Sequence, residues 1–220
     1  MRLEKTAEPT LEVISLTEAK RHLREEDTDL HDRLIEDLTI AAREEIETLT
    51  ERQMLTASYK LYLDRFPARG GGMYLSPLGY GWDDGSIVIP RPPLAAVSLV
   101  EFADTAGVSQ TVASSVYEVV GLPVGAISAD GAGRVRLKKD QSWPADVQSH
   151  PDSVCISFTA GYGAEPSTVP KLLRQAMLLV VGHFFDNPSS TEVLGSGQRM
   201  VEIPQGVQRI VARYNMRVRT

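Results

Sequence analysis

The sequence predicts an α+β fold, a helical bundle of about four helices with an antiparallel β module inserted between the second and third long helices. Apolar residues recur at helical spacing near both ends of the chain. Between these regions, short segments alternate apolar and polar residues and are separated by Gly, Pro and Asp, which is typical of strands. We therefore expect residues 1–55 and 161–220 to form one composite helical domain, and residues 56–160 to form a β-rich insertion.

The N-terminal region predicts an irregular arm over residues 1–13, followed by a short helix. Ser15 is placed to cap this helix, and Glu18 three residues later completes the pattern of a capping box. The acidic run at 25–27 is expected to end the helix. Its apolar side consists of Leu16, Ala19 and Leu23.

A longer second helix follows the acidic run. Asp27, Thr28 or Asp29 can cap it, because each side chain can accept a hydrogen bond from the first turn. Its apolar residues keep helical spacing over about six turns, while Asp, Glu and Arg occupy the opposite side. The inward face is expected to consist of Leu30, Leu34, Leu38, Ala41, Ala42, Ile46 and Leu49.

Alternating segments predict the strands of the β module, joined by turns of Gly, Pro and Asp. A glycine-rich loop over Phe66–Gly85 follows the first strand and carries Tyr74, Tyr80 and Trp82. Loops of this length are more often functional than accidental. The predicted strands are Thr56–Asp64, Ser86–Ile89, Val97–Phe102, Val116–Val119, Arg134–Leu137 and Val154–Phe158.

A third helix is predicted after the β module, with Thr168 as N-cap and Pro170 in the first turn. From Ala176 to Phe185 it is apolar on nearly every face, so other elements must cover it. The run is too short to span a bilayer. Ser189–Gln198 is small and polar, and we expect it to be a flexible connector.

A last amphipathic helix is predicted to begin near Pro204, with a basic stripe of Arg209, Arg213 and Arg217. Residues 1–51 hold fifteen Asp or Glu against seven Lys or Arg, whereas residues 199–220 hold five Arg against one Glu. This asymmetry suggests electrostatic docking, either to another copy of the chain or to an acidic partner. On charge alone, two solvated helix faces explain it equally well.

The chemistry-bearing residues do not form a catalytic or metal-binding pattern. The four histidines are scattered, the glycine pairs fit no phosphate-binding motif, and no Ser lies in a nucleophile elbow. Cys155 lies within a predicted strand, where a buried and inert thiol is the default. No secretory signal or membrane span is present. We expect no enzyme activity, no cofactor and no metal.

The order of the segments carries more information than any one of them. The chain opens with SLTEAKRHLR and then IAAREEIETLTERQMLTASYKLYLDRFP. It continues with SIVIPRPPLAAVSLVEF, Trp143-Pro144, VCISFTAGYG and VPKLLRQAMLLVVGHFFDNP, and closes with IPQGVQRIVARYNMR. This order resembles the head–tail connector proteins, also called adaptor or head-completion proteins, of long-tailed double-stranded DNA phages and of gene transfer agents. The resemblance spans about residues 13–217.

The resemblance implies a structural virion protein that forms a ring, commonly a dodecamer, beneath the portal protein. Such a ring extends the DNA channel, lets double-stranded DNA pass without sequence-specific binding, and presents the attachment surface for a tail-side neck protein. It implies a place at the head–tail interface of the virion, and in the host cytoplasm during assembly, with no membrane partner. Other neck components, a stopper or a tail terminator, are the first alternative. A small nucleotide-binding hydrolase is a distant second.

The resemblance also implies candidate residues. Because the C-terminal segment of related connectors reaches the portal, the expected portal contacts are Arg213, Tyr214, Arg217 and Arg219. The acidic front and the basic rear are expected to meet between neighbouring subunits. The candidate subunit-interface residues are Arg209, Glu44, Glu47, His183 and Phe184.

Overall fold

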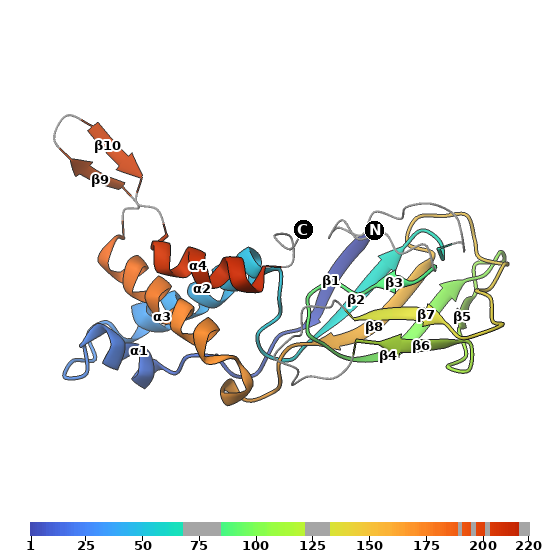
Figure 1. The fold of residues 1–220 in the computed structure, drawn as a ribbon, viewed down its shortest axis with the longest axis horizontal. Coiled ribbons are helices and arrows are strands. Elements are labelled where there is room, and N and C mark those ends of the chain that lie inside the picture. The colour runs from blue at the N-terminus through green and yellow to red at the C-terminus, as the bar shows by residue number, and fades with distance from the viewer. Residues whose placement is uncertain (68–84, 122–132, 189–190, 195–196, 201–202, 216–220) are drawn as a thin grey trace. The chain divides into compact units, whose positions relative to one another are not determined.

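The protein is described here by a computed structural model, which covers residues 1–67, 85–121, 133–188, 191–194, 197–200 and 203–215. The chain divides into two compact units, a β unit of Met1–Pro9 with Leu55–Ala164 and a helical unit of Thr10–Met54 with Glu165–Thr220 (Figure 1). The predicted α+β class is confirmed. The expected loop aromatics Tyr74, Tyr80 and Trp82 lie outside the described residues.

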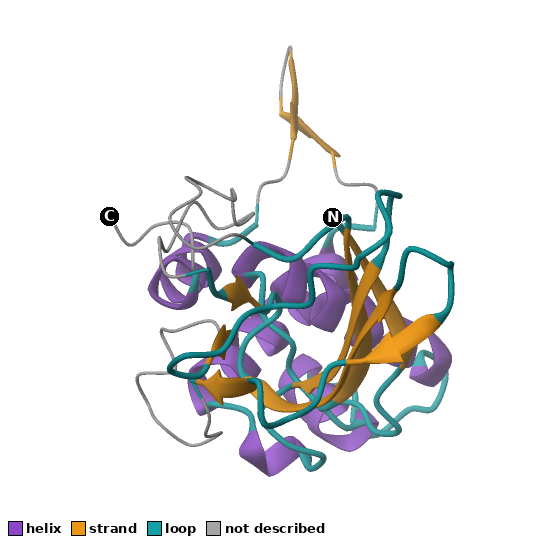
Figure 2. Ribbon diagram, turned by 90° about the vertical axis from the view of Figure 1, so that its right-hand side faces the viewer, coloured by secondary structure: helices purple, strands orange, loops and turns teal. Residues whose placement is uncertain are grey.

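The β unit contains a five-stranded antiparallel sheet, whose strands are orange in Figure 2. Its strands in spatial order are β1 (Arg2–Ala7), β2 (Ala57–Leu63), β8 (Val154–Ala160), β4 (Leu94–Ala103) and β5 (Ser109–Thr111). The prediction of an irregular arm at residues 1–13 is therefore wrong, because Arg2–Ala7 pairs along β2 as an edge strand. Its charged side chains are typical of an edge that resists pairing with other chains.

A second antiparallel sheet of three strands completes the core of the β unit. It consists of β3 (Ile87–Val88), β7 (Arg134–Leu137) and β6 (Tyr117–Val120). Side chains along β2 and β8 alternate between buried and half-buried, as the sequence predicts. Aromatic rings add to the core: Tyr59 stacks on its cross-strand neighbour Phe158 with centroids 5.4 Å apart, and Phe66 stacks on Trp143 at 4.7 Å.

Gly161 lies where the end of β8 meets the start of β2. Its φ is +133°, and a Cβ placed there would lie 2.6 Å from the backbone of Leu55 and Thr56. Its N–H donates to the carbonyl of Pro93 at 2.9 Å. The close approach of two backbones explains the glycine that follows the strand in the sequence.

The helical unit contains α1 (Leu16–Leu23), α2 (Asp32–Thr50), α3 (Lys171–Asp186) and α4 (Gln205–Tyr214). The other three helices all pack against α3 (Figure 1). The buried side chains of α3 are Leu173, Ala176, Met177, Val180 and Val181. The chain thus covers much of this apolar helix itself, although Leu172 remains 42% exposed.

The predicted cap of α1 is confirmed, but its acidic partner has another role. The Ser15 hydroxyl accepts a hydrogen bond from the N–H of Glu18 at 3.2 Å. The Glu18 carboxylate pairs with Arg174 of α3 at 2.6 and 2.8 Å. Arg174 also donates to the carbonyl of Pro166 at 2.9 Å. One terminal nitrogen of Arg174 contacts both carboxylate oxygens, and this ion pair joins α1 to α3.

The start of α2 differs from the prediction. The helix begins at Asp32, after an N-cap at His31, and none of the three expected caps serves it. Lys20 holds the preceding turn, because its amine contacts Asp29 at 3.0 Å and Asp32 at 2.7 Å. These contacts with the two carboxylates raise the pKa of Lys20, and the contact with Asp32 contributes most. The carboxylate of Asp29 is thereby directed toward α1 instead of a helix end.

The buried face of α2 is also rotated from the predicted one. Leu30 and Leu34, expected inside, are exposed, and polar side chains are buried in their place. Thr39 and Thr50 are accommodated because each hydroxyl donates to the carbonyl four residues earlier. The buried residues are Ile35, Thr39, Ala42, Arg43, Ile46, Glu47 and Thr50.

Two further predictions along the C-terminal region are wrong. Thr168 does not cap α3, because it closes the 3₁₀ turn η1 (Pro166–Thr168) by donating to the carbonyl of Glu165. The helix instead begins after Pro170. The expected connector at Ser189–Gln198 contains paired strands, β9 (Thr191–Leu194) and β10 (Gly197–Met200). The pairing is antiparallel and runs from Thr191 opposite Met200 to Leu194 opposite Gly197.

We predict that Gly161→Ala destabilises the β unit by more than about 3 kcal/mol, since the new Cβ meets backbone and the φ is unfavourable. Gly107→Ala is the matched control, because Gly107 also has a positive φ but open space around it. It should cost about 1 kcal/mol. Urea unfolding followed by tryptophan fluorescence measures this, as both tryptophans belong to the β unit. If Gly161→Ala and Gly107→Ala lowered the free energy of unfolding equally, the close approach of the two backbones at Gly161 would be contradicted.

The turn between β4 and β5 should depend on pH through Asp104. Its carboxylate accepts hydrogen bonds from the side chain of Gln110 and the N–H groups of Val108 and Ala106, each at 2.9 Å. These hydrogen bonds lower the pKa of Asp104, and the bond from Gln110 contributes most. The carboxylate therefore stabilises the turn above its unfolded pKa of about 3.9, and this contribution is lost as pH falls through the lower folded pKa.

The amide shifts of Ala106 and Val108, followed by NMR while the pH is lowered, should titrate with a midpoint below the ordinary Asp value. Asp104→Asn keeps an acceptor at this position and removes the titration. A midpoint at the ordinary value in the unaltered chain would contradict the hydrogen-bonded turn.

Candidate functional site

The basic stripe predicted on the last helix is present on the outer side of α4. Val207 and Val211 face the core and are buried, whereas Arg209 and Arg213 are exposed. Neither guanidinium forms an ion pair with any residue that the structure describes. Two positive charges on one face, unused by the fold, can therefore contact another molecule. The third member, Arg217, and the expected portal contact Arg219 lie outside the described residues.

The C-terminal end of α4 is fastened to the end of α2. The guanidinium of Arg52, which is 2% exposed, donates from Nε to the carbonyl of Tyr214 at 2.7 Å. Its charge also lies 5.9 Å from the centre of the Tyr214 ring. The side chain of Asn215 donates to the carbonyl of Leu49 at 2.8 Å. Tyr214 is thus held by its own chain.

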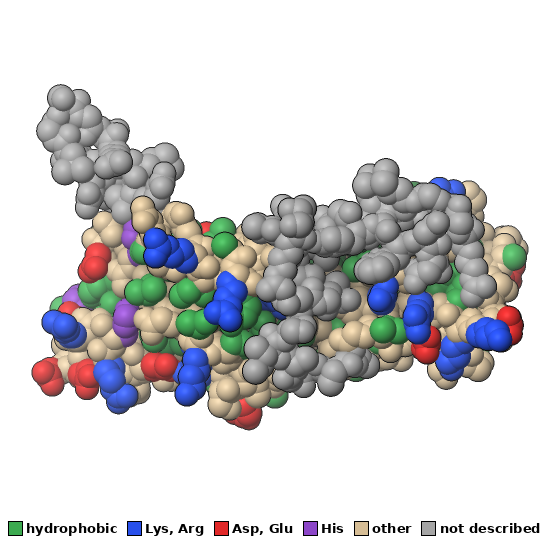
Figure 3. Space-filling view, viewed as in Figure 1, with side chains coloured by type: hydrophobic (Ala, Val, Ile, Leu, Met, Phe, Trp, Pro, Cys, Tyr) green, Lys and Arg blue, Asp and Glu red, His purple; other side chains and the backbone are tan. Residues whose placement is uncertain are grey.

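The five candidate interface residues do not form one surface. Arg209 and Glu44 are exposed on different helices, and His183 and Phe184 are half-buried near the end of α3. Glu47 is not on the surface at all, being 5% exposed inside the helical unit. Figure 3 shows hydrophobic side chains gathered on the visible face of this unit, over α3 and α4.

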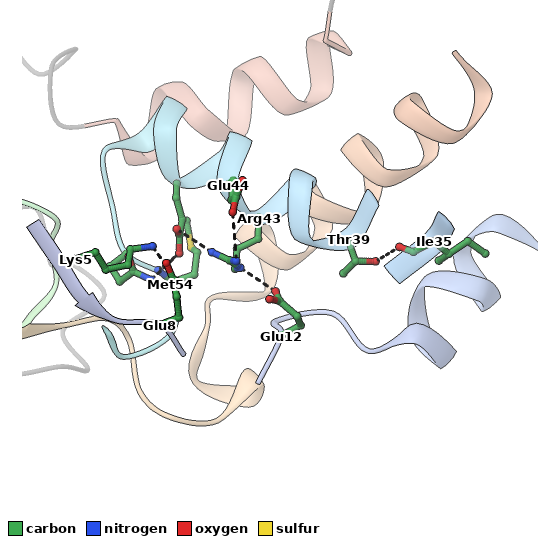
Figure 4. A network of polar contacts seen from close by, with 10 residues as sticks. Lys5, Glu8, Glu12, Ile35, Thr39, Arg43, Glu44 and Met54 are labelled. Carbon is green, nitrogen blue, oxygen red and sulfur yellow. Dashed lines mark hydrogen bonds and ion pairs between the residues drawn. The ribbon is translucent and has the colours of Figure 1, made fainter. Parts of the chain in front are cut away.

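Glu47 belongs to a buried polar network at the end of α2, in which Figure 4 labels Glu12, Arg43 and Met54. Its carboxylate accepts hydrogen bonds from the side chain of Gln53 at 2.8 Å, the N–H of Met54 at 3.0 Å and the guanidinium of Arg43 at 3.2 Å. Arg43 also donates to Glu12 at 2.8 Å. Burial lowers the pKa of Arg43, but the bond to Glu12 and the charge of Glu47 outweigh this and hold it above its ordinary value.

The described residues show little that favours a reaction. No group of three His, Cys, Asp or Glu side chains among them is placed to hold a metal ion. The thiol of Cys155 is half-buried, and desolvation raises its pKa, which disfavours the nucleophilic thiolate. A hollow of about 490 Å³ in the β unit is lined by Phe102, Trp143 and neighbouring residues, and Asp146 is its one titratable side chain.

In the part of the chain that the structure describes, no helix combines the length and apolar character needed to cross a membrane.

Comparison with solved structures identifies proteins of the same fold. The chain matches one in the virion of a native gene transfer agent particle, at 23% identity and a TM-score of 0.68, over 98% of this chain and 95% of that one. It matches others in the neck of an empty particle computed with C6 symmetry (21%, TM-score 0.70) and of a native particle computed with C12 symmetry (22%, TM-score 0.63), with the same coverage. No protein-family model and no curated protein matches the sequence.

Sequence reasoning identified the exposed arginines of α4 but missed the residues that position the helix. The burial of Arg43 and Arg52 could not be predicted from the sequence, because arginines near the end of an acidic helix are ordinarily solvated. The i to i+4 spacing of Arg43 and Glu47 was visible, yet that spacing is shared by surface pairs. Only the packing of α2 shows that this pair is internal.

We predict that Glu47→Ala lowers the free energy of unfolding of the helical unit by about 3–5 kcal/mol, because it leaves the buried charge of Arg43 poorly compensated. Glu44, which is exposed on the same helix, gives the control: Glu44→Ala should change the free energy of unfolding by less than about 0.5 kcal/mol. Urea unfolding followed by circular dichroism at 222 nm measures both.

Removing both charges, as Arg43→Met with Glu47→Gln, should recover most of the loss, since no buried charge remains and the amide oxygen can still accept from Gln53 and from the N–H of Met54. If the double variant is less stable than Glu47→Ala alone, the network is not the stabilising pair described above.

Proposed function

We propose that this chain is a structural, non-enzymatic neck protein of a phage-like particle, the adaptor that forms a ring beneath the portal. The observation that carries the proposal is the fold, which is shared over nearly the whole length with chains of gene transfer agent virions and necks. The C12 and C6 symmetries of those necks suit a ring of twelve copies of this chain. Such a ring would extend the DNA channel and offer a surface to which the tail attaches.

The proposed location is the head–tail interface of the virion, reached after assembly in the host cytoplasm. The partners would be other copies of the chain, the portal protein, and a tail-side neck protein such as a stopper or tail terminator. Passing double-stranded DNA would not be bound specifically. The net charge of −6 supports this, since an acidic conduit repels phosphate and lets DNA slide.

Portal contact is assigned to the end of α4 and the segment after it. Arg213 is exposed in the last turn of the helix, and Arg217 and Arg219 follow it in the sequence. Arg52 and Leu49 hold Tyr214 and Asn215, which precede Arg217 and Arg219 in the sequence. A positive segment suits carboxylates on the portal.

A stopper or tail terminator is the second candidate, because the similar chains are described as belonging to a neck without naming the component. The four-helix unit favours the adaptor. Negative-stain microscopy of the purified portal, with and without this chain, tests the proposal. An additional ring on the portal is the expected result. Failure to associate across a range of salt concentrations would contradict it.

We predict that deleting residues 216–220 weakens portal binding by at least about ten-fold and leaves the fold intact, because the deletion spares the anchored residues Tyr214 and Asn215. Arg213→Gln should weaken binding less. The affinity is measured by interferometry at increasing salt, and the truncated chain should show the shallower salt dependence. Unchanged affinity in the truncated chain would reject the tail as the portal contact.

A further inference from the structure

The outer side of α2 combines apolar and acidic side chains that the fold does not use. Leu34 is 48% exposed and Ile40 38% on α2, and Leu30, in the turn before the helix, is 81% exposed, which is unusual for large apolar side chains so close together. Asp37 and Glu44 are exposed on the same side. Helical periodicity places Leu34, Asp37 and Glu44 on one side of α2, and Leu30 lies in the turn just before the helix. We call this side, together with Leu30, the acidic face.

The acidic charges of this face are not neutralised within the chain. Asp37 has no ion pair with any described residue, and Glu44 has only a contact of 3.8 Å to Arg43. Arg43 is committed to Glu12 and Glu47 by shorter hydrogen bonds. Arg33 is exposed one turn before Asp37, so the acidic face combines apolar side chains, two carboxylates and one guanidinium. Of these charged groups, only Glu44 has an ion pair with a described residue, and it is the long contact to Arg43.

The outer side of α4 is complementary to it. Arg209 and Arg213 are exposed one turn apart, with Ala212 exposed beside them. Neither arginine pairs with a described residue. Long arginine side chains can cover apolar surface with their methylene groups while their guanidinium groups reach carboxylates. We call this the basic face.

We propose that the acidic face of α2 in one copy docks on the basic face of α4 in the next copy. Both helices pack against the core of the helical unit and turn these faces outward. The contact joins two different faces, so it is heterologous, and each copy keeps one face free for a further neighbour. Such a contact propagates from copy to copy until a ring closes. The inference rests on the proposed function and assigns the surface through which that ring forms.

Charge reversal gives a test with an internal rescue. Variant A carries Arg209→Glu and Arg213→Glu, and variant B carries Asp37→Lys and Glu44→Lys. Each should lose self-association by more than about ten-fold, because like charges then meet at every contact. Mixed in equal amounts, the acidic α4 of A meets the basic α2 of B, and the unaltered α2 of A meets the unaltered α4 of B. Every contact of an alternating ring is then attractive.

Association is measured by sedimentation velocity at low salt, and on the portal if the free chain is monomeric. Circular dichroism checks that each variant folds. The matched control for variant A is Lys139→Glu with Lys171→Glu, which makes the same change in charge as variant A at exposed positions outside both faces and should associate normally. An alternating ring closes only with an even number of copies, so the mixture should contain equal amounts of A and B.

Each outcome decides the matter. Loss in A and in B with recovery in the mixture supports the contact. Normal association of A or B alone overturns it, and so does loss without recovery, because the two faces then do not meet each other. If the unaltered chain associates neither with itself nor with the portal, the proposed function fails instead.

Discussion

The helical unit depends on the carboxylate of Glu47, which is buried and receives hydrogen bonds from three directions. Arg43 joins it to Glu12 on the segment that enters the unit, and Gln53 and Met54 join it to the segment that leaves. Two charges at about 5% exposure are tolerable only because each has several partners with good geometry. This network fixes the end of α2, and Arg52, immediately beyond it, fixes the end of α4.

The charges of Arg43, Glu47 and Arg52 are used inside the helical unit, whereas other charges on α2 and α4 remain exposed. Some acidic side chains of residues 1–51 form ion pairs with Arg43, Lys20 and Arg174. Others remain exposed on α2. The arginines of α4 form a second exposed group of opposite sign. A protein that needed only to fold would gain little from separating unpaired charges in this way. The separation is useful to a subunit that must recognise its neighbour.

The sequence predicted best those elements whose pattern has a single explanation. The alternation of β2 and β8 and the Ser15 cap were identified because each follows from local chemistry. Strand β1 was missed because most of its residues are polar, as befits an exposed edge. The phase of α2 was misjudged because its interior holds Thr39, Arg43 and Glu47, whose polar groups are satisfied by partners distant in the sequence or hidden in the helix. The exposed arginines of α4 were predictable, whereas the burial of Glu47 depended on tertiary packing.

The central claim is that assembly covers the outer side of α2. Hydroxyl-radical footprinting with mass spectrometry measures this directly, because leucine oxidation reports side-chain exposure in the free and the portal-bound protein. Leu30 and Leu34 should become strongly protected on the portal, while Val108, exposed on the β unit near β5, serves as the internal reference. Equal reactivity of Leu30 and Leu34 in the free and the bound chain, in a complex that has demonstrably formed, would contradict the account.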